Sequence, residues 1–142
     1  MDTNSIQDFT ENIEHLKRTG KYMEARLILE QIVSERDNSS DQEDTRPPWY
    51  HQQLGIVLRK LGFKEEAKVR ITQADEIVIR NFINHSKIIY EMPNEIRMAY
   101  YPNGPVVTKK VLESAARLQN SKPELLKAAG LLKSNSIAPD ND

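Results

Sequence analysis

Cysteine is absent from the 142-residue chain, and glycine occurs only five times. Without thiols the protein can form neither a disulfide framework nor a thiolate metal site. The scarcity of glycine beside many helix-forming residues favours an all-α fold. No apolar run approaches the roughly 20 residues that a membrane-spanning helix needs. The N-terminal sequence MDTNSIQDFTEN is too polar and acidic for a secretory or mitochondrial signal, so we expect a cytoplasmic protein.

A strong charge of either sign is also missing, since the net charge is −1. A nearly neutral chain is not steered strongly towards nucleic acid or anionic lipid. The charge is uneven, because residues 1–46 carry 6 Lys/Arg against 11 Asp/Glu and residues 47–90 carry 7 against 4. With 38% hydrophobic and 29% charged residues, the composition indicates one globular domain over residues 1–133.

Residues 48–77 have the pattern of two helices joined by a tight turn. Apolar positions recur three or four apart in the first helix, at Tyr50, Leu54, Val57, Leu58 and Leu61. Gly62 is placed to end that helix as a left-handed C-cap. Gly55 lies inside the first helix, where glycine costs roughly 1 kcal/mol relative to alanine. We therefore predict that the second helix passes close to Gly55.

This spacing resembles the tetratricopeptide repeat, a helix-turn-helix unit of about 34 residues. Over residues 48–79 the family pattern is matched directly by Leu54, Gly55 and Ala67, with Gly62 at the turn and Ala74 at the later small position. The departures are His51 for tryptophan, Leu58 for tyrosine, Ile71 for phenylalanine and Ile79 for the final proline. Residues 6–37 resemble a degenerate copy with Ile13 at the Gly55 position. The resemblance implies stacked antiparallel hairpins in a short superhelix, with extra C-terminal helices.

The turn glycines Gly20 and Gly62 are 42 residues apart, about eight more than the repeat period of about 34. The surplus falls in residues 37–46, DNSSDQEDTR, which contain no apolar side chain. We therefore expect an acidic loop there. A calcium loop is the alternative, but the central glycine and the terminal glutamate of an EF-hand are missing.

Beyond Ile77 the helical spacing continues, either as the same helix or as a new one after a break near Asn84. Pro93 ends it, and residues 94–101 form a short helix or part of an extended piece. A last helical pair is predicted in the tail, with a boundary formed by a cap at Asn120–Ser121 and by Pro123. Its two stripes are Val107, Val111, Ala115 and Leu118, then Leu125, Ala128, Ala129 and Leu132. Residues 134–142 are expected to be disordered.

Motifs that carry chemistry are scarce. The chain has no glycine-rich phosphate loop, serine nucleophile elbow or His-Glu metal motif. Glu11 and His15 share a helix face, but two ligands do not make a metal site. Carboxylates are numerous on the predicted exposed faces, and none is flanked by residues that would bury it and tune it for acid/base work. We therefore expect no enzymatic activity, no metal and no cofactor.

The resemblance implies a protein-interaction module, in which the first helices of successive repeats line a concave groove for a partner segment. The predicted partner-binding residues are Glu14, Lys17, Arg18, Trp49, Gln53, Ile56, Arg59 and Lys60. Gln7, Thr10, Glu11 and Gln52 map to the same groove. Gln52 and Ile56 stand where chaperone-binding members carry lysine and asparagine, so a clamp for chaperone tails is not expected. With Trp49 and Ile56 as the apolar floor of the groove and the cations beside them, the expected partner segment has an apolar residue near an acidic one.

Two other functions remain open from the sequence. The repeat face could form a homodimer without a peptide ligand. The basic C-terminal helices could contact nucleic acid, through Lys109, Lys110, Arg117, Lys122, Lys127 and Lys133. Basic residues on an amphipathic helix more often form its solvated face, and their density here is modest.

We predict that limited proteolysis cuts first within residues 37–46, because no residue of that segment can be buried. Mass spectrometry of the early fragments locates the cut. Resistance of this segment, with first cleavage elsewhere between residues 6 and 133, would contradict the predicted insertion.

Overall fold

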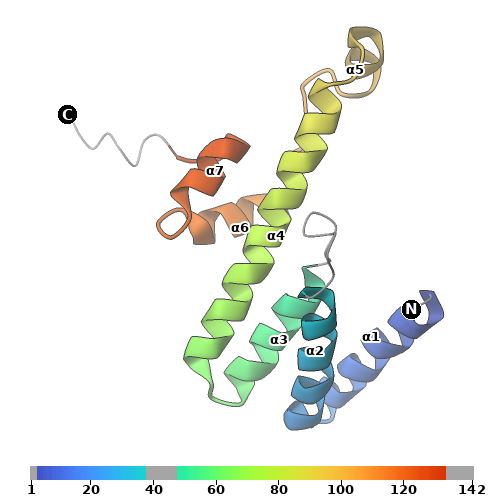
Figure 1. Cartoon of the computed structure of the whole chain (residues 1–142), viewed down its shortest axis with the longest axis vertical. Coiled ribbons are helices and arrows are strands. Elements are labelled where there is room, and N and C mark those ends of the chain that lie inside the picture. The colour runs from blue at the N-terminus through green and yellow to red at the C-terminus, as the bar shows by residue number, and fades with distance from the viewer. Residues whose placement is uncertain (1–2, 38–47, 134–142) are drawn as a thin grey trace. The chain divides into compact units, whose positions relative to one another are not determined.

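The computed structural model of the chain describes residues 3–37 and 48–133. Within this part every regular element is an α-helix and no strand occurs, so the predicted all-α class is confirmed (Figure 1). The helices of the described part are α1 (Thr3–Arg18), α2 (Tyr22–Asp37), α3 (Trp49–Lys60), α4 (Lys64–Tyr90), α5 (Asn94–Tyr100), α6 (Lys109–Leu118) and α7 (Pro123–Ala129). The predicted segments 37–46 and 134–142 lie outside the described residues, except that Asp37 is the last residue of α2.

Left-handed glycines end the first and third helices, as the sequence predicts. Gly20 has φ 76° and Gly62 has φ 92°, a region that a Cβ disfavours. Beyond each glycine an amide closes the turn: Lys21 N–H donates to the Leu16 carbonyl at 2.8 Å, and Phe63 N–H donates to the Leu58 carbonyl at 2.9 Å. These bonds satisfy carbonyls that the helix ends leave without a partner.

Helix α4 is continuous for 27 residues. It runs through Asn84, so the alternative with a break there is wrong. It ends at Tyr90, and Pro93 caps the short helix α5. The chain after α5 is a turn followed by residues without regular structure, up to Thr108. Although α4 is long, neither it nor any other helix among the described residues is apolar enough to cross a bilayer.

Three predictions about the tail are wrong in detail. Helix α6 begins at Lys109 because the Thr108 hydroxyl accepts the Val111 N–H at 3.3 Å, so Val107 precedes the helix and is 39% exposed. Helix α7 is preceded by Lys122, with no side-chain cap, rather than by a cap at Asn120–Ser121. Ala128 is exposed instead of lying on the buried stripe.

The chain divides into two compact units, Met1–Ala74 and Asp75–Asp142, and α4 contributes to both. The residues expected to form one domain, 1–133, thus contain two hydrophobic cores. The core of the first unit comprises Ile13, Leu16, Ala25, Leu29, Ile32, Val33, Tyr50, Leu54, Val57, Leu58 and Ala67. The core of the second comprises Val78, Ile79, Phe82, Val111, Ala115, Leu118 and Leu126. In the first unit, α2 packs against both α1 and α3 (Figure 1).

The close approach predicted at Gly55 is confirmed. A Cβ added to Gly55 would lie 2.6 Å from Ile71 Cγ1 and 3.2 Å from the Ala67 carbonyl oxygen. Both atoms belong to α4, so the backbone of α3 at Gly55 lies against a side chain and a backbone oxygen of α4. The second distance involves backbone, which cannot move away as a side chain can. Gly55 therefore fixes the spacing of these two helices.

Replacing Gly55 by leucine is expected to lower the free energy of unfolding by about 1–3 kcal/mol, through overpacking of this contact. Chemical denaturation measures the change. In a double-mutant cycle, Gly55→Ala should cost less when Ile71 is also replaced by alanine, because the nearest clashing atom is then gone. Equal costs in both backgrounds would contradict the close contact.

Candidate functional site

The residues predicted to bind a partner belong to α1 and α3 of the first unit. The Lys17 ammonium donates a hydrogen bond to Gln53 Oε1, although the two residues are 36 positions apart. The same ammonium lies 3.9 Å from the Glu14 carboxylate. Gln53 is buried, and the Lys17 side chain is only 20% exposed. The structure thus brings Glu14, Lys17 and Gln53 together, and their contact joins α1 to α3.

The other predicted cations are exposed. Arg18 lies in the last turn of α1, and Arg59 and Lys60 lie in the last turn of α3. The partial negative charge at a helix C-terminus stabilises a cation there by about 0.3–1 kcal/mol. Lys17 differs from these three, because its ammonium already has two partners within the protein.

The predicted apolar floor is only partly available to a ligand. Trp49 packs against the core of the first unit, and its ring stands edge-on to that of Tyr50 with centroids 5.2 Å apart. Ile56, two helical turns further along α3, is half-buried. Part of the Trp49 side chain is therefore buried in the core of the first unit, and only the rest could contact a ligand. Among the remaining mapped positions Thr10 and Gln52 are half-buried and Glu11 is exposed, while the Gln7 side chain lies outside the described residues.

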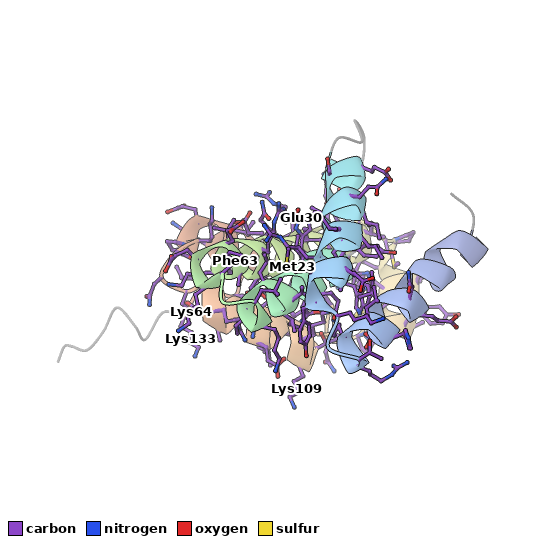
Figure 2. All side chains as sticks on the ribbon, turned by 90° about the horizontal axis from the view of Figure 1, so that it is seen from below. Met23, Glu30, Phe63, Lys64, Lys109 and Lys133 are labelled. Atoms are coloured by element: carbon purple, nitrogen blue, oxygen red, sulfur yellow. The ribbon has the colours of Figure 1, made fainter. Side chains whose placement is uncertain are left out.

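Arg26 forms a cluster that the sequence analysis did not identify. Its guanidinium donates to Glu30 at 2.8 Å and lies 3.7 Å from Glu66. It also stands 4.7 Å from the centroid of the Phe63 ring. Glu30 lies on α2, as Arg26 does, whereas Phe63 lies in the turn before α4 and Glu66 in its first turn (Glu30 and Phe63 are labelled in Figure 2). The hydrogen bond with Glu30 raises the pKa of Arg26, which stays charged. The contacts with Glu66 and Phe63 connect α2 to the start of α4.

One carboxylate contradicts the expectation that none has neighbours that would bury it. Asp75 is 4% exposed. Its oxygens accept from the Ser114 hydroxyl at 2.8 Å and from two nitrogens of Arg117, each at 2.8 Å. These hydrogen bonds from the guanidinium to Asp75 raise the pKa of Arg117. A carboxylate held this way joins α4 to α6 within the second unit, and the arrangement is structural.

Removing Arg117 should therefore be costly. Arg117→Ala leaves the buried carboxylate with Ser114 as its remaining side-chain donor, and we expect the free energy of unfolding to fall by about 1–3 kcal/mol. Lys122→Ala is the matched control, because it breaks a more exposed ion pair with Glu76 at 3.2 Å; its cost should stay below about 1 kcal/mol. Urea denaturation compares them, and equal costs would show that burial of Asp75 does not matter.

The second unit contains an open hollow of about 580 Å³ that the sequence analysis missed. It lies among the last turns of α4, the segment after α5 and the C-terminal end of α7. One signal was present in the sequence, since Phe82, Ser86 and Tyr90 recur every four residues on one helix face. That spacing does not show what faces the helix, which depends on the fold.

No protein-family model, curated protein or solved structure matches this chain. Among the described residues, no group of three His, Asp or Glu side chains is placed to hold a metal ion. The function is therefore inferred from the geometry of the two units.

Proposed function

We propose that the first unit is a protein-interaction module, similar to a tetratricopeptide-repeat protein, which binds a segment of a partner across α1 and α3. The observation that carries this proposal is the contact of Lys17 with Gln53. It brings the two first helices of the predicted repeats together, as a shared binding face requires. The close approach of α3 and α4 at Gly55 supports the same packing.

The side chains along α3 define the segment that this face would accept. Trp49, Ile56 and Lys60 are spaced by seven and four residues, so they follow one side of the helix. The half-buried apolar residues come first, and the exposed Arg59 and Lys60 follow at the C-terminal end. A partner segment would bury its apolar residue against Ile56. Its acidic residue would pair with Arg59 and Lys60. The partner is therefore an apolar and acidic protein segment.

Charge reversal of Arg59 and Lys60 to glutamate tests this proposal. Both side chains are exposed, so the melting temperature should not change. Binding of the protein that co-purifies from the native host should weaken by roughly tenfold or more, since the partner's acid would then face like charge. Calorimetry with the purified partner measures the affinity.

Lys64→Glu with Lys68→Glu is the matched control, because it makes the same change in net charge on exposed positions of α4. Partner binding should survive in this control. Unchanged binding in the Arg59/Lys60 variant would contradict the proposal. A sedimentation measurement that shows a dimer broken by the same variant would favour the homodimer instead.

A further inference from the structure

The walls of the hollow come from three parts of the second unit: α4, the segment after α5 and the end of α7. Along α4 it is lined by residues of one face, including Phe82, Ile83 and Lys87. The segment after α5 lies close to α4 at Gly104, where an added Cβ would lie 2.9 Å from the Tyr90 hydroxyl oxygen. A binding site on walls that are already ordered loses little entropy when it is filled.

The wall beyond α7 is fixed by hydrogen bonds. Gly130 takes a left-handed conformation with φ 74°, and Leu131 N–H then donates to the Leu126 carbonyl at 2.8 Å. The Gln119 side chain donates to the Leu131 carbonyl and accepts from the Lys133 amide, each at 3.2 Å. Leu131 is thereby held as an apolar part of the hollow.

The charge of the hollow has one sign. Lys87 and Lys127 line it, and none of the described residues that line it is acidic. Neither lysine makes an ion pair with a side chain in the described part of the chain. Each lies in the last turn of its helix, where a cation is favoured. That preference explains why each helix has a lysine near its end. It does not explain why both lysines line the same hollow, or why no carboxylate lines it with them.

A polar atom without a partner lies in the same wall. The Ser86 hydroxyl is buried and makes no hydrogen bond within the described structure. A buried hydroxyl without a partner costs about 1–3 kcal/mol. The Ser86 side chain can rotate about its Cα–Cβ bond. Its hydroxyl could then donate a hydrogen bond to an anionic head group that the neighbouring Lys87 holds.

We propose that this hollow binds a small amphipathic anion, an apolar chain or ring that carries one carboxylate or sulfonate group. The apolar part would lie against Phe82, Ile83 and Leu131, and the head group between Lys87 and Lys127. The volume of about 580 Å³ falls within the roughly 300–1,000 Å³ of small-molecule sites. This site is separate from the protein-binding face proposed on α1 and α3, and it does not depend on that proposal.

Two dyes that differ in their charge test the site on the full chain. Anilinonaphthalenesulfonate has an aromatic body with a sulfonate, and phenylnaphthylamine has a similar body without one. Fluorescence titration should show that the anionic dye binds and that decanoate displaces it. Lys87→Gln with Lys127→Gln should weaken the anionic dye roughly tenfold and leave the neutral dye unchanged.

Two further variants keep the test decisive. Lys109→Gln with Lys110→Gln removes the same charge from exposed positions of α6 and should not affect either dye. Ala128→Phe places a ring in the hollow from an exposed position and should abolish binding of both. If the two lysine pairs have equal effects, recognition of the head group is contradicted. If Ala128→Phe leaves binding intact, the dyes bind elsewhere and the proposal is overturned.

Discussion

The contact of α3 with α4 at Gly55 is the constraint on which the first unit depends. Because Gly55 has no side chain, Ile71 and the Ala67 carbonyl lie where a Cβ would otherwise be. The helices can then approach closely enough to bury Leu54 and Leu58 on the same side of α3. This fixes the rotation of α3, and with it the side on which Ile56, Arg59 and Lys60 are found. The proposed binding face is thus set by a residue that does not belong to it.

Polar contacts between residues far apart in the sequence determine how the packed helices are oriented. Apolar burial is roughly proportional to area and has little preference for orientation, whereas a hydrogen bond requires a particular pair of atoms. Lys17 with Gln53 fixes α1 against α3, and Arg117 with Asp75 fixes α6 against α4. Asp75 also shows that a buried charge is tolerated when its oxygens are satisfied.

The two proposed sites use similar side chains for different ligands. In each, cations in the last turns of helices stand near half-buried apolar side chains. The face on α1 and α3 extends over two helices and suits a protein segment. The hollow of the second unit is bounded by α4, α7 and the segment after α5, and its volume suits a small molecule. The shape of the surface, more than its composition, separates the two proposals.

The sequence by itself determined the features that depend on neighbouring residues. Helical periodicity gave the all-α class, Gly20 and Gly62 marked the turns, and an unfavourable glycine at position 55 marked the close contact. It did not show the burial of Asp75, the pairing of Lys17 with Gln53 or the hollow of the second unit. Asp75 and Ser114 are 39 residues apart. Periodicity shows that a helix has a buried face, but which distant residue meets that face is decided only when the helices pack.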